Sequence, residues 1–295
     1  MKNVYIMSAN RSAIGGFGGT LKNHCPVDLG TLVAKEAIAR SGYEANEVEH
    51  AVFGNVIHTE PRDMYVSRVI ALQAGMDKAS AALTVNRLCG SGLQAIVSAS
   101  QILMLGDASV AMAGGVEVMS NGAHIVQGFR WGSRMGDGQV HDMMLGALHD
   151  PFGHGHMGIT AENISSRYQI SREMQDEFAL TSQKRAHEAI KNGNFKDQIL
   201  PIEIKTRKGI EVFEVDEHTK PDTSIETLSG LKTAFKKNGV VTAGNASGIN
   251  DGASALVLAN EEKAKNGKPL ARIVSYGFGG VDPDEMGMGP VPASK

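Results

Sequence analysis

The ten residues Asn86–Ala95, with Cys89 near their centre, constrain the fold more than any other part of the chain. A short apolar run, residues 81–85, ends just before them, and a helical pattern begins inside them. The residues that this pattern places on one helix face are Leu93, Ile96, Val97, Ser100 and Leu103. Apolar residues three and four positions apart predict an amphipathic helix from about Ser91. The sequence therefore predicts a strand, a tight glycine-rich turn that contains Cys89, and a helix.

The predicted position of Cys89 suits a nucleophile. Just before a helix, unpaired backbone N–H groups and the positive end of the helix dipole favour an anion, and the thiolate is the nucleophilic form of cysteine. The neighbouring glycines, Gly90 and Gly92, allow a tight turn and let a substrate approach the backbone closely. A buried and inert cysteine is the alternative interpretation, because most free cysteines are of that kind and such turns have many uses.

The composition is that of an ordinary globular protein. The chain has 295 residues, of which 21% are charged and 42% hydrophobic, with a formal net charge of −3. This length suggests roughly two domains, and the small charge gives no support for nucleic acid or a membrane surface as a partner. No run approaches the ~18 apolar residues of a membrane span, and no signal peptide is evident. We therefore expect a cytoplasmic location.

Strands and helices alternate over the first part of the chain. Residues 28–40 predict a helix that begins with Asp28 as its N-cap and ends before Gly42. Apolar runs within 48–56 and at 110–113 predict strands, and the second run is expected to end at the glycine pair that follows it. This alternation predicts an α/β protein with a mixed sheet.

From about Asn121 the pattern changes, and the change predicts an insertion. Residues 128–140 are loop-like and basic and contain the only tryptophan, and the α/β pattern returns at 253–259. We therefore predict one α/β domain interrupted by a small inserted domain. The predicted boundaries are an α/β domain of residues 1–120 and 249–270, an inserted domain of residues 121–248, and a short piece of a further domain at residues 271–295.

Four dispersed motifs resemble those of the thiolase family. They are residues 86–93 (NRLCGSGL), 114–120 (GGVEVMS), 156–163 (HMGITAEN) and 243–253 (AGNASGINDGA). They occur in the family's order, and the resemblance runs over essentially the whole chain. Residues 53–65 are most similar to those of bacterial biosynthetic-type β-ketothiolases that accept a broad range of chain lengths. By this resemblance the chain is identified as a member of the acetyl-CoA acetyltransferase family.

The resemblance implies a fold, a reaction and a role for Cys89. The implied fold is a layered α/β/α/β/α architecture of two similar halves, of which this chain would hold the first half and little of the second. The implied reaction is the reversible Claisen condensation of acetyl-CoA with acetyl-CoA or another acyl-CoA to a β-ketoacyl-CoA, with thiolysis as its reverse. Cys89 would carry the acyl group as a thioester, and its backbone N–H would donate to the oxyanion. Coenzyme A and acetyl-CoA would be substrates, with no permanently bound cofactor.

The resemblance also implies a CoA site on the inserted domain. Its residues would be Leu148, His156, Met157, Lys220, Phe235, Ala243 and Ser247. Lys220 stands where biosynthetic thiolases often have an arginine beside the adenine, and a lysine would stack less well there. Met157 and Phe235 could instead be core residues, and residues 250–252 are better explained as a turn before a strand.

Two further features of the inserted domain allow either a purely structural or a functional interpretation. Arg130, Trp131 and Arg134 could line a solvated loop, but the same region forms a tetramer contact in thiolases. We therefore expect an interface and a homodimer or homotetramer, since a lone tryptophan in a glycine-rich loop usually packs on a partner. His149 and His154, together with His156 of the CoA set, lack a carboxylate or cysteine at a suitable spacing, so we expect no metal site.

The remaining catalytic motifs of the family are not found in residues 1–295. Thiolases continue through an Asn-Glu-Ala-Phe, a Gly-His-Pro and a Cys-x-Gly-Gly segment. These supply the base for the nucleophile, the cysteine that moves the α-proton, and parts of two oxyanion holes. Cys25, in a Cys-Pro loop, replaces none of them. Losing general acid–base help slows a reaction by about 10²–10⁴-fold, so we expect a catalytically incomplete fragment of a longer thiolase.

Three other functions are weighed against this interpretation. A non-catalytic thiolase-like module would bind CoA or lipid without turnover even with Cys89 intact. A decarboxylating ketoacyl condensing enzyme shares the architecture and the cysteine, and it would use malonyl rather than acetyl donors. A cysteine hydrolase is disfavoured, because it has no use for a CoA-binding inserted domain.

Overall fold

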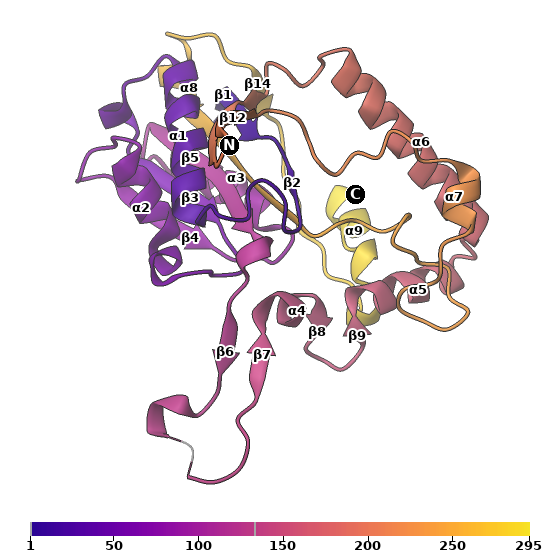
Figure 1. The fold of residues 1–295 in the computed structure, drawn as a ribbon. Helices are drawn as coiled ribbons and strands as arrows, with labels where there is room; N and C mark the ends of the chain where they lie inside the picture. Colours follow the sequence, from indigo (N-terminus) through magenta and orange to yellow (C-terminus); the bar gives the residue numbers. More distant parts are fainter. Residues whose placement is uncertain (1, 133) are drawn as a thin grey trace. The chain divides into compact units, whose positions relative to one another are not determined.

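The structure is a computed structural model that describes residues 2–132 and 134–295, and its chain divides into two compact units (Figure 1). Unit 1 combines Met1–Met144, Lys196–Glu217 and Ile249–Val274, and unit 2 combines Leu145–Phe195, His218–Gly248 and Ser275–Lys295. The α/β class expected from the sequence is confirmed. The expected domain boundaries stay a prediction, because compactness alone does not mark the limits of an inserted domain.

A mixed sheet forms the centre of unit 1. Its strands are β1 (Val4–Ser12), β2 (Gly15–Gly16), β3 (His50–Gly54), β4 (Ala81–Val85), β5 (Val110–Val118), β10 (Ile199–Leu200), β13 (Asn250–Asn260) and β14 (Ala271–Ile273). The main path of the described sheet runs β10-β1-β13-β5-β3-β4, with β14 paired to β1 and β2 to β13. Strand β3 is parallel to both β4 and β5, whereas β13 is antiparallel to β1 and β5.

Helices cover both faces of this sheet. Helices α1 (Pro26–Ser41) and α2 (Val66–Gln73) lie on one face and α3 (Ser91–Leu105) on the other (Figure 1). Helix α1 begins earlier than expected: Cys25 is its N-cap and Asp28 lies in its first turn. The reason is Pro26, whose fixed φ suits the first helical position. Gly42 ends the helix as predicted, in the left-handed conformation with φ 81°.

The face that α3 packs on the sheet differs from the one expected. Its buried residues are Ser91, Ala95, Ala99, Ser100 and Leu103. Leu93, expected on this face, is 74% exposed, and Val97 is only partly buried. The physical reason is the close approach of α3 to the strands: the face that it buries carries small residues such as Ala95 and Ala99, and Leu93 lies outside that face.

Strands β5 and β13 are both longer than the sequence predicted. Strand β5 continues through Gly114 and the glycine after it, where a strand end was expected, and β13 already begins at Asn250, where a turn was expected. A Cβ added at Gly114 would clash with the Phe53 ring and lie 2.5 Å from the carbonyl oxygen of Ser254. The glycine therefore serves close packing inside the sheet rather than the end of a strand.

The remaining elements of unit 1 are short. They are the hairpins β6 (His124–Val126) with β7 (Val140–Asp142) and β11 (Ile202–Thr206) with β12 (Gly209–Phe213), the helix α8 (Glu261–Ala264), and the 3₁₀ helices η1 (Ala45–Glu47), η2 (Pro61–Tyr65), η3 (Met119–Asn121) and η4 (Phe129–Trp131). The β6–β7 hairpin extends away from the body of unit 1 (Figure 1). Helix α4 (Met143–Ala147) crosses the boundary between the units.

Unit 2 is mainly helical. Its elements are β8 (His149–Asp150), β9 (Gly155–His156), α5 (Met157–Arg167), α6 (Arg172–Lys191), α7 (Ile225–Ser229), η5 (Pro283–Met288) and α9 (Pro290–Ser294). Helix α6 is capped by Ser171, whose side chain accepts from the backbone N–H of Met174. Within α6, the buried Asp176 pairs with Arg172 at 2.7 Å. Asp176 also accepts from Asn245 at 2.9 Å, which ties the loop before residue 248 to this helix.

One helical window of the described chain, Leu88–Leu105, is long and apolar enough to cross a membrane by length and composition alone. No run of this length was expected from the sequence. The window consists mostly of α3, and this helix packs one face on the sheet of unit 1. Core helices of soluble proteins pass the same test, so this single window is weak evidence for a membrane span.

The packing at Gly114 makes a testable prediction about stability. We expect Gly114→Ala to lower the free energy of unfolding by about 2 kcal/mol, because the facing carbonyl oxygen is backbone and has no room to move. Gly138→Ala is the matched control, since a Cβ added there meets nothing within 4 Å. Urea unfolding of both variants measures the difference. Equal midpoints for the two variants would contradict the packing described here.

Candidate active site

Cys89 lies in the turn between β4 and α3, so the predicted strand–turn–helix arrangement is confirmed. Gly90 is the N-cap of α3, and the cysteine directly precedes it. Cys89 is exposed, and within residues 2–132 and 134–295 no hydrogen bond to its thiol is found. The preceding residue, Leu88, has φ 46°, a left-handed conformation that costs a non-glycine residue about 1 kcal/mol. The turn that presents the thiol is therefore strained and must be held by its surroundings.

Two side chains hold the Cys89 turn. The Ser91 hydroxyl accepts from the backbone N–H of Arg87 at 2.8 Å and donates to the carbonyl oxygen of Leu88 at 2.6 Å. The Asn86 side-chain oxygen accepts from the N–H of Leu88 at 2.9 Å. No role was predicted for Ser91 or Asn86 from the sequence. Their residue types, which favour turns and helix starts, are the signal that could have identified them.

Gly54, at the end of β3, lets the turn lie directly on the strands, and Gly115 on β5 lies within ordinary contact distance of α3. A Cβ added at Gly54, the last residue of β3, would lie 2.7 Å from the Cβ of Ser91. A Cβ added at Gly115 on β5 would lie 3.5 Å from the Cα of Gly92. The start of α3 therefore packs backbone against backbone at the carboxyl ends of the parallel strands β3 and β4, a common place for a reactive site in α/β proteins.

Cys25, the other cysteine, has surroundings that suppress reactivity. Its thiol donates to Asp28 at 2.9 Å and lies 3.1 Å from a guanidinium nitrogen of Arg62. Burial and the neighbouring Asp28 raise the pKa of Cys25 to about 12, although Arg62 acts in the opposite direction. Because the thiolate is the nucleophile, Cys25 is not a candidate for the reaction.

Four residues of the expected CoA set lie together in unit 2. The His156 ring stacks on the Phe235 ring, with centroids 4.7 Å apart and planes 19° apart. The backbone N–H of Met157 donates to the carbonyl oxygen of Leu148 at 2.8 Å. His156 also caps α5, because its Nδ1 accepts from the N–H of Gly158 at 3.0 Å. Burial, with the charge of neighbouring His149, holds the pKa of His156 below its usual value, so the ring is neutral at pH 7.

The other three residues of the expected set occupy a different part of unit 2. Lys220 is exposed, and its backbone N–H donates to Gln183 on α6 at 2.8 Å. Ala243 and Ser247 are exposed on the loop that Asn245 ties down. In the part of the chain that is described, no hydrogen bond or ring contact joins these three to the stacked pair of His156 and its phenylalanine partner. The role of the set in CoA binding stays a prediction.

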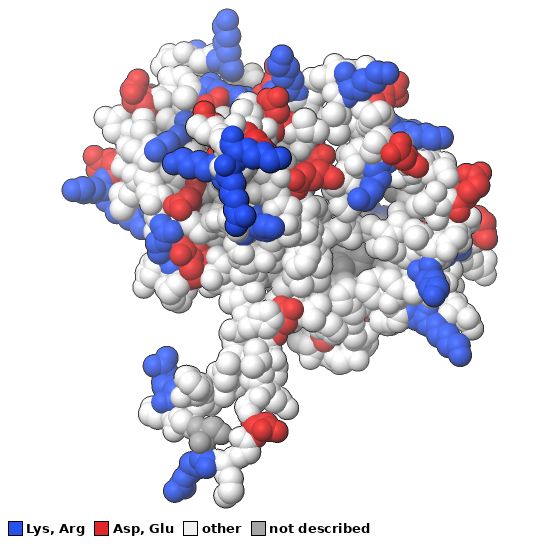
Figure 2. Space-filling view, viewed as in Figure 1, with Lys and Arg blue, Asp and Glu red and all other residues white. Residues whose placement is uncertain are grey.

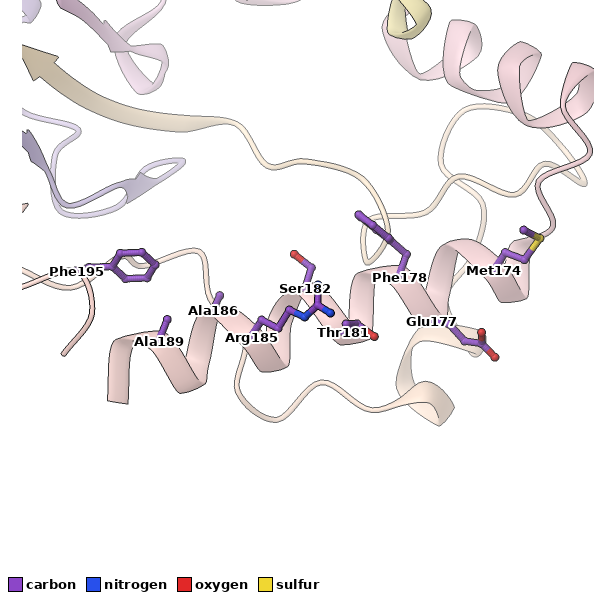
Figure 3. Close-up of a pocket in the computed structure, with 9 residues that line it drawn as sticks. All are labelled: Met174, Glu177, Phe178, Thr181, Ser182, Arg185, Ala186, Ala189 and Phe195. Carbon is purple, nitrogen blue, oxygen red and sulfur yellow. The ribbon is translucent and has the colours of Figure 1, made fainter. Parts of the chain in front are cut away.

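A groove of about 790 Å³ runs along α6 in unit 2 (Figure 3). Its lining residues are Met174, Glu177, Phe178, Thr181, Ser182, Arg185, Ala186, Ala189 and Phe195. None of the residues expected to bind CoA lines it. The groove is therefore not the site that the sequence predicted.

The residues expected at an interface lie on the β6–β7 hairpin. Trp131 is 87% exposed and its neighbour Phe129 is 78% exposed, and both belong to η4 at the end of the hairpin. Arg130 lies between them and Arg134 follows in the same loop. Figure 2 shows charged side chains of both signs spread over the visible face, including the hairpin. Two exposed aromatic rings in one short loop are unusual for a surface that stays in water.

Of the three neighbouring histidines, for which no metal site was expected, two are in contact. His149 and His156 meet edge to face, with ring centroids 5.1 Å apart. Among the described residues, no group of three or more His, Cys, Asp or Glu side chains is arranged to hold a metal ion.

The contrast between the two cysteines makes a prediction about thiol chemistry. At pH 8 we expect iodoacetamide to label Cys89 well before Cys25, because a pKa of about 12 leaves about 1 in 10,000 of the Cys25 thiols ionised. Raising the pH towards 10 should increase Cys25 labelling about tenfold for each pH unit. Peptide mass spectrometry measures both sites in one sample. Faster labelling of Cys25 than of Cys89 in the folded protein would contradict the assignment.

Comparison with known proteins identifies the family. The family model described as "Thiolase, N-terminal domain" matches residues 4–262. The chain is 56% identical over 297 residues to the beta-ketothiolase BktB of Cupriavidus necator. The matched region covers 100% of this chain and 75% of that protein. It is 46% identical to the acetyl-CoA acetyltransferase of Syntrophomonas wolfei, again over 75% of that protein.

Solved structures agree with these relatives. The crystal structure of the Bacillus anthracis acetyl-CoA acetyltransferase matches with a TM-score of 0.96 at 48% identity, over 100% of this chain and 75% of that one. Human mitochondrial 3-ketoacyl-CoA thiolase in complex with CoA matches with a TM-score of 0.96 at 40% identity, over 99% and 74% of the two chains. The fold and the acyltransferase class expected from the sequence are thereby confirmed, and the chain belongs to the thiolase family.

Proposed function

We propose that this chain accepts an acyl group from acyl-CoA on Cys89, as the first half of a thiolase reaction. The observation that carries the proposal is the exposed Cys89 thiol in the strained turn directly before α3. A thiol presented at the start of a helix, with Gly90 and Gly92 directly after it, is open to a substrate and lies where a negative charge is favoured. The 56% identity to a beta-ketothiolase supports the same assignment.

The acyl transfer follows from the chemistry of the thiolate. The Cys89 sulfur attacks the carbonyl carbon of the acyl-CoA, and the carbonyl oxygen takes up the negative charge, to which the Cys89 backbone N–H donates. The bond between this carbon and the sulfur of CoA then breaks. CoA leaves as a thiolate and takes up a proton, and the acyl group stays on Cys89. The bond that forms and the bond that breaks are both thioesters, so the step is close to balanced in energy.

The condensation step needs groups that the described residues do not bring to Cys89. Removal of the α-proton of acetyl-CoA requires a base near the acylated cysteine, and no residue in the described ranges 2–132 and 134–295 makes a hydrogen bond to that thiol. The chain spans about 75% of the length of the relatives it matches. Our proposal for residues 1–295 is therefore confined to the acylation of Cys89, and the Claisen step requires a base beside the acylated thiol.

The His156 cluster is the proposed contact with the acyl-CoA substrate. The stacked rings of His156 and Phe235, with Leu148 and Met157 beside them, form a mostly apolar surface with one neutral imidazole. Such a surface suits the pantetheine arm, and Lys220, Ala243 and Ser247 would contact more distant parts of CoA. The CoA complex of the human relative supports CoA as a substrate here. No permanently bound cofactor belongs to the proposal.

The proposal extends to assembly and location. The exposed aromatic residues of the β6–β7 hairpin support a homodimer or homotetramer in which this hairpin meets a partner copy. A cytoplasmic location and the absence of nucleic-acid or membrane partners are further parts of the proposal, supported by the net charge of −3 and the mixed surface charges.

The acyl-enzyme is directly observable. After prolonged incubation with acetyl-CoA, we expect mass spectrometry to find one acetyl group on the Cys89 peptide, because the thioester is stable once CoA has left. Cys89→Ala should carry none, and Cys25→Ala, the matched control, should be labelled like the unaltered chain. Tight CoA binding without any adduct on Cys89 would favour a non-catalytic binding module instead.

The stacked pair makes a prediction about CoA binding. We expect Phe235→Ala to weaken CoA binding about fivefold, since the His156 ring loses the partner that orients it. Phe178→Ala is the matched control, because that side chain is 78% exposed on α6 and is not in the proposed site. Equilibrium binding by calorimetry compares the two variants. An unchanged dissociation constant for Phe235→Ala would remove this cluster from the proposed site.

A further inference from the structure

Glu117 is a half-buried acid on the same face of the sheet as the Cys89 helix. It lies on β5, two residues after Gly115, which faces Gly92 of α3. Val116 points to the opposite face, where it faces Gly30 of α1. Because side chains alternate along a strand, Glu117 shares the α3 face with Gly115 and lies just beyond the start of that helix. No function has so far been assigned to it.

The Glu117 carboxylate holds the chain that follows β3. One oxygen accepts from the backbone N–H of Ile57 at 2.9 Å and from the side-chain amide of Asn55 at 3.1 Å. The other accepts from the backbone N–H of Val56 at 3.0 Å. Asn55 donates further to the carbonyl oxygen of Val116 at 2.9 Å, so the turn of residues 55–57 is fixed to β5 at several points.

This turn contacts both ends of the segment that carries Cys89. At one end, the backbone N–H of Asn55 donates to the carbonyl oxygen of Val85, the last residue of β4, at 3.3 Å. At the other end, Gly54 packs directly against Ser91, whose hydroxyl closes the strained turn at Leu88. A shift of residues 54–57 is therefore transmitted to the start and the end of the Cys89 turn.

The charges around Glu117 make its own charge state variable near neutral pH. The pKa of Glu117 is raised to about 7, mainly by burial and also by the charge of Asp63 on η2. The hydrogen bonds from the backbone N–H groups of Ile57 and Val56 act in the opposite direction and lower this pKa. Asp63 is itself fully buried and accepts from the backbone N–H and the hydroxyl of Thr59. On the adjacent strand β13, the Asp251 carboxylate accepts hydrogen bonds from the backbone N–H and the hydroxyl of Ser120. In the Cys89 turn, the charged residue is Arg87.

We propose that Glu117 is a positioning residue for the Cys89 nucleophile, and that its carboxylate form fixes residues 55–57 so that the Cys89 turn keeps its reactive geometry. The inference deepens the proposed function, on which its importance for catalysis rests. Above about pH 7 the ionised carboxylate accepts all three donors. Below that pH the protonated acid holds the donors less strongly, and the turn loosens. Glu117 itself touches no reacting atom.

The test compares the rate of Cys89 alkylation by iodoacetamide in the unaltered chain and in Glu117→Gln between about pH 5.5 and pH 8. Each rate is divided by the thiolate fraction measured in the same protein by ultraviolet absorbance, so that the ratio compares the reactivity of the thiolate alone. We expect a ratio near one at the acid end and a rise to about tenfold at pH 8, centred near pH 7, because a small displacement of a reacting group costs about this much or more. Glu203→Gln, at an exposed position on β11, should keep a ratio of one throughout.

A ratio that does not change with pH would overturn the proposal, since a purely structural defect slows Cys89 equally at every pH. If Glu117→Gln does not fold, amide hydrogen exchange of the unaltered chain decides. We then expect the protection of Val56 and Ile57, relative to amides of the sheet, to increase as the pH rises through 7, and constant relative protection would overturn the proposal. Iodoacetamide needs no acyl transfer, so a failure of the proposed acylation remains distinguishable from a failure of this inference.

Discussion

The close packing of the start of α3 on the sheet is the constraint on which the rest of the site depends. Gly54 meets the backbone and the small side chain of Ser91 there, and no room is left for a side chain at Gly54. This proximity forces the chain into a sharp turn with Leu88 in a left-handed conformation. A turn of this kind leaves Cys89 exposed directly before the first N–H groups of the helix. The reactive position of the thiol is thus a consequence of packing below it.

Polar side chains around this packing hold the turns in place by hydrogen bonds to the backbone. Ser91 closes the turn from the helix side, and Asn86 closes it from the strand side. Glu117 on β5 fixes the turn that follows the adjacent strand β3, at an energetic cost, since its carboxylate is held in a poorly hydrated place. Unit 2 has its own local order, in which Asp176 and Asn245 fix the loop that carries the expected CoA residues. Each unit therefore fixes its functional residues with side-chain hydrogen bonds.

The sequence predicted the elements of the site better than their packing. The α/β alternation, the helix start near Ser91 and the turn position of Cys89 were correct, because local periodicity and glycine placement determine them. The buried face of α3 was wrong at Leu93, because hydrophobicity identifies a helix stripe but not how closely the helix approaches the sheet. The glycines of β5 were taken as a strand end, although the strand continues through them and Gly114 serves a close contact that only the folded sheet reveals. The roles of Glu117 and Asn55 also depend on contacts between distant parts of the chain. They could not be derived from their neighbours in sequence.

The measurement that tests the central claim most directly counts the CoA released when the chain meets a large excess of acetyl-CoA. If Cys89 accepts an acyl group and the chain lacks the groups for condensation, the account predicts release of at most one CoA per chain, with no acetoacetyl-CoA formed. Release should be lost in Cys89→Ala, which also controls for contaminating enzyme. Continuous formation of acetoacetyl-CoA by the unaltered chain, absent in the variant, would show that the chain completes the reaction by itself and would contradict this account.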